Sequence, residues 1–496
     1  MKICLLIPPA KTIDKTPERV YGCTFTYYKQ PELPMLYAAS MLEKDGHSVA
    51  LRDFTNGNSW EEFCRFVNEK NYDVYIFHTV LLSESIDIKA ANYILDNTSA
   101  RVIFFGPHPT LKPENFLLNE RCYVARGEVE FVIRDLVRAF ENNPPSPPFN
   151  KGGMGGLSGD IKGISYLKHG RITETETYGV IEDLDSLPFP ARHLIQEKQD
   201  EYFNPKLPNR PVTLILTSRG CSFRCYYCVP NAISWARELE WKRFHNGKKP
   251  PVKLRSPQNI IEEFKLVKEQ GYKAVSVVDD LFLFGGKKRI LDICAGLKGV
   301  GLPFGVLARC DLILDDEMVK ALAYAGCKYI DLGIESLDQK VLDDIKKDMD
   351  VATVKRAIEL LNKYGIEPKA NIMFGASPVE TKESMEMTIK EVSHLPINYC
   401  MFSIATPFPG TEFAEKARKQ GFAVEPEIND LENNLSPTEK ALVSYPDLPK
   451  EALEKAVKKA NRRFYLNPKR ILFQLKQVKS LKKLKDLILT GWKVIK

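Results

Sequence analysis

Three cysteines lie close together in the segment SRGCSFRCYYC, residues 218–228. Thiolates spaced C-x3-C-x2-C can hold three irons of a 4Fe–4S cube and leave the fourth iron open for a ligand. A structural zinc site normally takes four protein ligands, and no second paired Cys or Cys/His element follows to supply the fourth. The spacing therefore favours an iron–sulfur cluster held by Cys221, Cys225 and Cys228 over zinc.

The chain around this triplet has the composition of a globular protein with large cores. Its 496 residues are 44% apolar and 27% charged, which is too long for one compact core. No apolar run approaches the ~20 residues that cross a bilayer, and the apolar opening is too short for a signal sequence before Pro8 and Pro9 stop it. We therefore expect a cytoplasmic protein whose cysteines are mostly reduced thiols.

The formal net charge of +7 is concentrated at the end of the chain. From Leu466 onward nine lysines and arginines face one acid, Asp486, so the rest is close to neutral. Apolar residues between Leu475 and Ile495 recur at steps of three and four, as in an amphipathic helix. Such a helix either lies on an anionic membrane face or packs on its own protein with a solvated lysine face. No zinc finger, RNP-like motif or basic-aromatic stripe indicates a nucleic-acid partner.

Up to about residue 142, short β-branched apolar runs alternate with helical stretches. The runs at 3–7, 49–52, 73–77, 101–105 and 122–125 predict strands, and the intervals 33–44, 60–69, 86–95 and 129–140 predict helices. This alternation indicates parallel βαβ units, and hence an α/β fold with a doubly wound, Rossmann-like sheet. Such a sheet binds ligands at the carboxyl ends of its strands.

A second alternation begins at Val212. Strands are predicted at 213–217, 274–278, 304–308, 329–332, 369–374 and 399–404, and helices at 257–269, 287–297, 316–325, 351–363 and 381–394. Six units suit a partial (β/α)6 barrel better than an eightfold one. The cysteine triplet follows the first of these strands, at the end where barrel enzymes keep their chemistry.

These patterns predict four parts of the chain. Residues 1–142 form the first domain, 143–190 a linker with a Pro/Gly-rich insertion and a hairpin that turns at His169-Gly170, 191–410 the barrel, and 411–496 a helical region with the basic amphipathic tail.

The triplet ahead of a barrel resembles the radical S-adenosylmethionine (SAM) enzymes, and the resemblance spans the whole barrel. In that family the open iron binds the amino and carboxylate groups of SAM, and one electron cleaves SAM to a 5′-deoxyadenosyl radical that abstracts hydrogen. The resemblance implies a 4Fe–4S cluster, SAM, and a one-electron reductant such as flavodoxin or ferredoxin.

The same resemblance implies SAM-binding roles at strand ends. Asp279 and Asp280 stand where many members carry a Gly-Gly-Glu turn for the SAM ammonium, and they depart from that form; helix capping and solvation at a strand end is the alternative. The remaining candidates are Tyr227 for adenine, Arg309 for the SAM carboxylate, Glu335 and Ser336 for the ribose, and Ile372 and Gly375 in the segment against which adenine packs. For Glu335 the alternative is a helix N-terminal acid.

The first domain resembles the cobalamin-binding domain that precedes the barrel in one large branch of this family. The residues that carry this resemblance follow three strands: Thr79; Gly106, Pro107, His108 and Thr110; and Gly127 and Glu128. Small residues let backbone approach a bulky ligand tail. The Asp-x-His-x-x-Gly loop of cobalamin mutases has no counterpart here, because no histidine lies between Pro8 and Pro34; His47 reads as structural. The lower face of cobalt is then implied to be non-histidine.

We expect from this resemblance a cobalamin-dependent radical SAM methyltransferase that acts on an unactivated carbon of a small-molecule or lipid substrate. One SAM would methylate cob(I)alamin, a second would give the adenosyl radical, and methylcobalamin would deliver the methyl group to the substrate radical. A rival is a non-methylating cyclase, oxidase or rearrangement enzyme. A third alternative, a binding or regulatory protein with a vestigial cluster, fits poorly with the intact triplet. The basic tail adds the expectation of peripheral contact with the inner membrane face.

Overall fold

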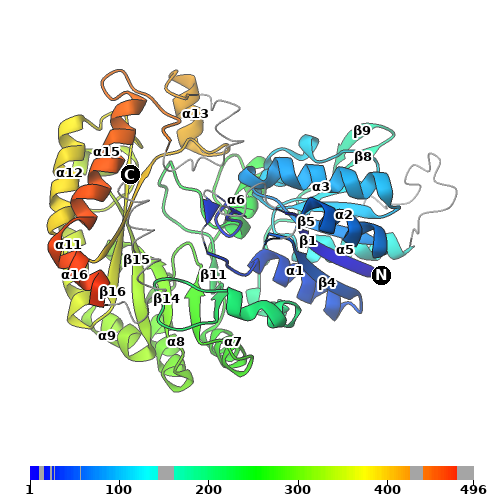
Figure 1. Ribbon diagram of the computed structural model, residues 1–496, viewed down its shortest axis with the longest axis horizontal. Coiled ribbons are helices and arrows are strands. Elements are labelled where there is room, and N and C mark those ends of the chain that lie inside the picture. Colours follow the sequence, from blue (N-terminus) through cyan, green and yellow to red (C-terminus); the bar gives the residue numbers. More distant parts are fainter. Residues whose placement is uncertain are drawn as a thin grey trace. The chain divides into compact units, whose positions relative to one another are not determined.

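The computed structural model describes residues 1–9, 16–22, 25–26, 28–55, 57, 59–142, 161–424 and 440–476 (Figure 1). The chain divides into two compact units, which are described separately. The first unit holds Met1–Pro205, Asn209–Ser222 and Val229–Asp280, and the second holds Lys206–Pro208, Phe223–Cys228 and Leu281–Lys496. The Pro/Gly-rich stretch from residue 143 and the basic tail beyond Lys476 lie outside the described residues.

The first unit contains the doubly wound sheet expected for the first domain. Its parallel strands are β1 (Lys2–Ile7), β4 (Ser48–Asp53), β5 (Val74–His78), β6 (Arg101–Phe105) and β7 (Cys122–Ala125). They run in the order β4-β1-β5-β6-β7, so the strand order reverses between β1 and β5. All five predicted strands are confirmed. Ligands of such sheets bind at the reversal, beyond the carboxyl ends of the strands.

Helices cover both faces of this sheet, so every side chain of β5, β6 and β7 is buried. The helices are α1 (Leu33–Lys44), α2 (Trp60–Glu69), α3 (Glu84–Asn97), the short α4 (Pro107–Leu111) and α5 (Glu130–Asn142). One apolar core lies under α1 and α5, which contact each other, and a second lies under α2 and α3 (Figure 1). A capping box between Ser59 and Glu62 starts α2.

The hairpin assigned to the linker extends this sheet. Strand β8 (Ile164–Lys168) pairs antiparallel with β7, and β9 (Arg171–Glu174) pairs with β8 across the expected turn at His169 and Gly170. A further two-stranded piece, β2 (Thr16–Pro17) and β3 (Phe25–Thr26), lies between β1 and α1. The sequence predicts the hairpin but not its pairing with β7. The four-part division of the chain stays a prediction.

The first unit also contains the start of the second strand series. Strand β10 (Val212–Ile215) pairs in parallel with β13 (Ala274–Val277), and the short β11 (Ser218–Arg219) pairs antiparallel with β12 (Lys253–Leu254). Helix α6 (Ala232–Phe244) follows the cysteine loop, where no helix was predicted, and α7 (Pro257–Glu269) has its predicted bounds. The side chain of Ser256 caps α7 ahead of Pro257 at the first helical position.

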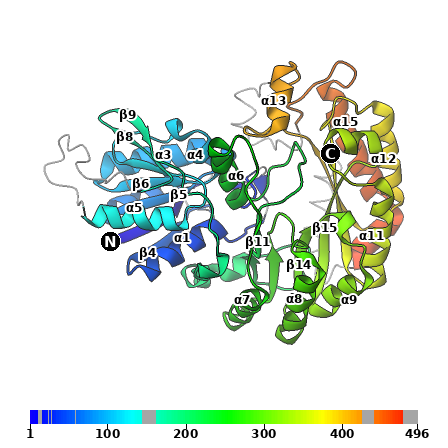
Figure 2. The ribbon, with the colours of Figure 1, turned by 180° about the vertical axis from the view of Figure 1, so that it is seen from behind.

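The second unit continues the alternation of strands and helices. Strands β14 (Phe304–Ala308), β15 (Cys327–Glu335), β16 (Glu367–Phe374) and β17 (Tyr399–Ile404) pair in parallel in chain order. Figure 2 shows its helices along one side of this sheet. They are α8 (Gly286–Val300), α9 (Asp316–Ala325), α10 (Gln339–Asp344), α11 (Val351–Lys363) and α12 (Lys382–His394). All six strands expected for the barrel are therefore present in the chain.

The C-terminal region is helical, as predicted. It contains α13 (Glu412–Lys419), α15 (Lys450–Tyr465) and α16 (Pro468–Lys476). The buried guanidinium of Arg470 donates to the carbonyl oxygens of Ser393, Leu395 and Ile397, so α16 is anchored to the second unit at its start. Among the described residues, no helix is both long enough and apolar enough to cross a membrane.

Candidate functional site

The cysteine triplet lies on the loop that follows β10 and β11. Cys221, Cys225 and Cys228 are each half-buried, whereas the other described cysteines, apart from Cys64, are buried. Within the described part of the chain, no three His, Cys, Asp or Glu side chains converge on a point that could hold one metal ion. A four-iron cube needs no such convergence, because each cysteine binds a different iron. The residue type and exposure of these thiols fit a 4Fe–4S cluster.

In the first unit, Asp279 holds the start of the cysteine loop. Its fully buried carboxylate accepts hydrogen bonds from the Thr217 backbone N–H at 2.6 Å and the Ser218 hydroxyl at 2.8 Å. The Thr217 hydroxyl and, at 3.2 Å, the Ser218 backbone N–H donate to the same carboxylate. A buried carboxylate that accepts several hydrogen bonds fixes the backbone around it. Asp279 therefore positions the segment that leads to Cys221, and its role toward SAM stays a prediction.

Asp280 holds both sides of the same loop. Its carboxylate accepts from the Gly220 backbone N–H at 3.1 Å and from the Asn231 backbone N–H at 2.7 Å. Asn231 also caps α6, so the loop and the helix that follows it share this carboxylate. Burial raises the pKa of Asp280 to about 6, against the lowering effect of its hydrogen bonds. The two adjacent aspartates therefore hold the cysteine loop in place through hydrogen bonds. This role differs from the alternative considered for them, helix capping and solvation at a strand end.

In the second unit, Arg309 faces the second cysteine of the triplet. Its Nη1 lies 3.9 Å from the Cys225 Sγ, and its guanidinium stacks on the Phe223 ring at 3.6 Å. Asp311 accepts from Nε and Nη2 at 2.9 Å each, and the Asp348 carbonyl accepts from Nη2. The predicted contact with the SAM carboxylate would therefore have to share a guanidinium that Asp311 already binds in bidentate fashion.

Glu335 and Tyr227, both predicted from the sequence, meet at a lysine that the sequence analysis missed. The Lys347 ammonium lies 2.9 Å from the Glu335 carboxylate and 3.4 Å from the Tyr227 hydroxyl. Lys347 is 4% exposed. Burial lowers the pKa of Lys347, but the charges of Glu335 and Cys225 raise it by more, so the ammonium stays charged. Burial together with Glu335 and Cys225 also holds the pKa of Tyr227 well above its usual value.

The backbone around this trio is strained. Glu335 has φ +68° at the end of β15, where the pairing with β16 shifts register. Lys346 and Asp348, on either side of Lys347, have φ of +54° and +48°. Residues other than glycine adopt positive φ at a cost of order 1–3 kcal/mol each, and such residues cluster at functional sites. A Cβ on Gly333 would lie 2.8 Å from a Glu335 carboxylate oxygen and 3.0 Å from the Lys347 nitrogen, so a larger residue there would displace the ends of both side chains.

The other second-unit candidates lie deeper in the fold. Ile372 is fully buried on β16 and alternates with the more open Asn371 and Met373, so it lies on the opposite face of the strand. Gly375 has φ +74°; its N–H donates to Glu380 and its carbonyl accepts from Tyr445 at 2.8 Å.

Ser336 and Glu380 are buried in the same region. Ser336 uses its hydroxyl to accept from the Asp338 N–H at 3.1 Å. Burial raises the pKa of Glu380 to about 8. The structure thus brings Tyr227 and Glu335 together through Lys347, and the SAM-binding roles of Ser336, Ile372 and Gly375 stay predictions.

In the first unit, the cobalamin candidates surround the carboxyl ends of β5, β6 and β7. Thr79 is fully buried, and its hydroxyl oxygen has no hydrogen-bond partner among the described residues. Gly106 has φ +116°, and a Cβ there would meet the Thr79 carbonyl at 2.6 Å. The Thr110 hydroxyl accepts from the Gly127 N–H at 3.2 Å, and Pro107 is buried at the start of α4. An unpartnered buried hydroxyl among small residues fits a ligand crevice.

The charged candidates there already have protein partners. The His108 ring lies 2.8 Å from a Glu84 oxygen. Glu128 is 1% exposed and accepts from the Ile181 N–H at 2.5 Å. Its carboxylate also binds Arg219 at 3.0 Å and Arg237 at 3.4 Å. These bonds make His108 and Glu128 part of the scaffold, and their contact with cobalamin stays a prediction.

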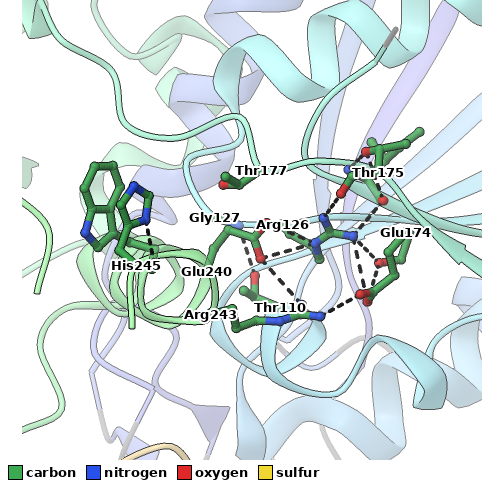
Figure 3. A network of polar contacts seen from close by, with 12 residues as sticks. Thr110, Arg126, Gly127, Glu174, Thr175, Thr177, Glu240, Arg243 and His245 are labelled. Atoms are coloured by element: carbon green, nitrogen blue, oxygen red, sulfur yellow. Dashed lines mark hydrogen bonds and ion pairs between the residues drawn. The ribbon is translucent and has the colours of Figure 1, made fainter. Parts of the chain in front are cut away.

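The turn after β7 is fixed by a second charged network, drawn in Figure 3. Arg126, fully buried, lies 3.2 Å from both carboxylate oxygens of Glu240 on α6 and donates to the Thr175 carbonyl at 2.6 Å. Arg243 joins Glu240 and Glu174 from the other side (Figure 3). Helix α6, which follows the cysteine loop, is thereby bound to the loop that carries Gly127.

A pocket with several charged lining residues lies at the carboxyl ends of β1 and β4. Glu18, Arg19, Glu32 and Asp53 are among the residues that line it. Burial raises the pKa of Glu18 to about 7 and that of Glu32 to about 8. Glu32 lies 3.2 Å from His78, whose pKa burial lowers to about 3. Sequence analysis missed these residues, although Glu18 and Glu32 flank the gap between the first strand and the first helix.

Comparison with known proteins agrees with this geometry. Residues 215–392 match the radical SAM superfamily. A protein of Pyrococcus horikoshii named an uncharacterized methyltransferase is 28% identical over 95% of this chain and 93% of its own length. An anaerobic magnesium-protoporphyrin IX monomethyl ester cyclase of Rubrivivax gelatinosus is 24% identical over 59% of this chain and 48% of its own. Hopanoid C-3 methylase of Methylococcus capsulatus is 24% identical over 84% and 74%.

Two solved structures share the fold over most of the chain. OxsB, a cobalamin-dependent SAM radical enzyme with aqua-cobalamin and SAM bound, superposes with a TM-score of 0.71 at 15% identity and covers 98% of this chain and 70% of its own. TsrM of Kitasatospora setae, a radical SAM methyltransferase, superposes with a TM-score of 0.64 at 16% identity over 86% and 77%. Residues 215–392 of the chain thus match the radical SAM superfamily, and the fold of the chain is similar to the folds of OxsB and TsrM.

Proposed function

We propose that this protein is a cobalamin-dependent radical SAM methyltransferase that methylates an unactivated carbon. The observation that carries the proposal is the cysteine triplet on a domain that is preceded by a doubly wound sheet, in a chain similar over nearly its whole length to a protein named a methyltransferase. Hopanoid C-3 methylase and TsrM add support, because their names state the same reaction class. When bound, the cluster and SAM supply radical chemistry and cobalamin supplies methyl transfer.

Different residues of the chain would bind the cluster, position its loop and contact SAM. Cys221, Cys225 and Cys228 would hold the cluster, and Asp279 and Asp280 hold the loop on which Cys221 lies. Tyr227, Arg309, Glu335 and the other strand-end candidates would contact SAM. Precise placement matters here, because a reacting group displaced by about 1 Å loses much of the rate that orientation provides.

Cluster binding is the first test. Anaerobically reconstituted protein is expected to hold about four irons and four sulfides per chain, and replacing the three cysteines with alanine should remove them. A matched control replaces Cys64, Cys122 and Cys294, which removes the same number of thiols from elsewhere. Full iron content in the first variant would place the cluster at another site. SAM should also change the EPR spectrum of the reduced cluster.

Cobalamin binding is tested at Thr79. We propose that the crevice around Thr79, Gly106 and Thr110 holds part of the cofactor, with its buried hydroxyl as a contact. Thr79→Val removes the hydroxyl and keeps the shape, so retention of hydroxocobalamin by the full chain should fall. Stability without cofactor should not fall, because an unpaired buried hydroxyl is costly. Equal retention by both proteins would remove Thr79 from the site.

A non-methylating enzyme is the second candidate, because a magnesium-protoporphyrin ester cyclase is among the similar proteins. The two reactions differ in what becomes of SAM. A methyltransferase releases S-adenosylhomocysteine as well as 5′-deoxyadenosine, whereas a cyclase that uses SAM only as a radical source releases 5′-deoxyadenosine alone. Mass spectrometry of both nucleosides separates the two functions.

We also propose that the protein acts at an anionic membrane face on an apolar substrate, and that it takes electrons from a flavodoxin or ferredoxin. Hopanoid C-3 methylase supports an apolar substrate by its name. The end of α15 and α16 expose Leu466, Leu472 and Leu475 at 50%, 59% and 47%. Lys455, Lys458, Lys459, Arg462 and Arg463 line a basic hollow on α15. Apolar side chains beside cations are typical of peripheral membrane contact.

Truncation after Lys476 tests this contact. It spares Arg470, which packs on the second unit, whereas a cut after Pro468 would remove it and destabilise the fold. The truncated protein keeps the exposed leucines and the basic hollow but loses the lysine-rich tail, so it should sediment less with vesicles rich in anionic phospholipid at low salt, while cluster content is unchanged. Failure of the full-length protein to sediment would overturn the membrane proposal and leave the methyltransferase proposal intact.

A further inference from the structure

One buried cation, Arg309, lies beside Cys225, and a second, Lys347, contacts Tyr227, two residues further along the chain. Arg309 is 6% exposed and directs Nη1 at the Cys225 Sγ from 3.9 Å, while its other nitrogens hold Asp311. Lys347 is 4% exposed, and Cys225 is among the charges that act on it. Each cation has a carboxylate partner of its own, Asp311 or Glu335. Two ion pairs are thus arranged around a single half-buried thiol.

The fold keeps Lys347 in this place at a cost. Lys346 and Asp348 both adopt positive φ, and Glu335 does so too. Strain at Glu335 and on both sides of Lys347 is not what surface solvation or helix termination requires. Lys346 provides the contrast, because its side chain is 46% exposed and pairs with Glu412 in solvent. The neighbouring lysines therefore differ in burial while sharing charge and sequence context.

We infer that Lys347 is a positioning residue which, with Arg309, places positive charge beside the cluster bound through Cys225 and so raises its reduction potential. This inference rests on the proposed function. Reduction adds one electron to the cluster from an external one-electron donor of the flavodoxin type, and no bond or proton changes. The added negative charge is stabilised by a nearby cation more strongly in a buried site than in water. Local charge and hydrogen bonds to sulfur are recognised determinants of cluster potential.

The test is a potentiometric EPR titration of the reconstituted full-length protein without SAM. Lys347→Met should make the cluster at least tenfold harder to reduce, a shift of about 59 mV or more to lower potential. Lys347→Arg, which keeps the charge, should restore most of the potential. Lys346→Met removes one charge from the adjacent exposed lysine and should leave the potential unchanged.

A second variant separates charge from folding. Glu335→Gln removes the anion and leaves Lys347 in place, so the potential should rise, opposite to Lys347→Met. An unchanged potential in a cluster-loaded Lys347→Met protein would overturn the inference, as would an equal shift in Lys346→Met. If Lys347→Met fails to hold iron, a lowered or unchanged potential in Glu335→Gln overturns it instead. Absence of a cluster from the wild-type protein would refute the proposed function itself.

Discussion

Two clusters of buried charged side chains, one in each unit, differ in how their charges are matched. In the first unit, Arg219 and Arg237 bind Glu128 and Glu130, and all four side chains are almost fully buried. Burial opposes the charge of Arg219, but Glu130 and Glu128 raise its pKa by more. None of the four has a positive φ. The four charges therefore compensate one another, and the backbone of these residues is not strained.

In the second unit, the Glu335–Lys347 pair is largely buried, and positive φ occurs at Glu335 and at the two residues that flank Lys347. Its cation interacts with a group, Cys225, that is expected to carry a cofactor. Burial of charged side chains therefore does not by itself mark a functional site. Backbone strain combined with an interaction directed at a reactive side chain does mark a functional site, because selection for folding alone would favour a relaxed backbone.

The largest effect is expected from breaking the matched cluster. Arg219→Met leaves Glu128 and Glu130 buried with less compensation, and the loss of one partner in a buried pair costs about 3–5 kcal/mol. Thermal unfolding of the cofactor-free protein measures this loss. Lys288→Met, in an exposed pair with Asp292, is the control and should change the melting temperature far less. Equal melting temperatures for Arg219→Met and the wild type would mean that the first cluster is not structural.

A pH-dependent effect is expected from Glu380, a buried carboxylate whose contact is the Gly375 amide. Burial raises its pKa to about 8. The folded protein then binds this proton more tightly than the unfolded chain, so the stability it contributes is present below pH 4.5 and is lost as pH rises toward 8. The stability of wild type relative to Glu380→Gln should therefore fall across that window in denaturant titrations. A difference that does not vary with pH would refute the raised pKa.

The smallest effect is expected at the strained segment itself. Asp348 is exposed with φ +48°, so Asp348→Gly should raise stability by about 0.5–1 kcal/mol. Asp350, two residues on, has φ −80° and caps α11 through the Ala352 N–H, so Asp350→Gly should lower stability slightly. Chemical denaturation of the two variants should give opposite signs. A loss of stability in both would mean that the backbone at Asp348 is not strained.

Periodicity predicted the scaffold because strands and helices there alternate with apolar faces. Helix α9 matches its expected bounds, since Asp315 caps its start and Gly326 ends it in the left-handed region. Helix α6 was missed for a physical reason. Its buried positions include Arg237 and Glu240, which pair with Glu128 and Arg126 far away in the chain. These charged positions erase the apolar periodicity that identifies a helix.

The candidate site was predictable in part. The cysteines follow from their spacing, whereas Tyr227 and Glu335 were predicted from the resemblance to radical SAM enzymes. Lys347 does not, because it lies in the charged run Lys346–Asp348, which is typical of a solvated loop. Its burial depends on a tertiary pair with Glu335. The bracing role of Asp279 was likewise hidden, since its partners at 217 and 218 are distant in the chain.

The most direct test of the account is the fate of SAM in the fully loaded protein. Reconstituted protein carrying cobalamin is reduced anaerobically and given SAM, and both nucleoside products are quantified by mass spectrometry. We predict 5′-deoxyadenosine and S-adenosylhomocysteine together, the first lost when the three cluster cysteines are alanine and the second lost when cobalamin is omitted. Release of 5′-deoxyadenosine alone from cobalamin-loaded protein would contradict methyl transfer, and release of neither would contradict the radical SAM assignment.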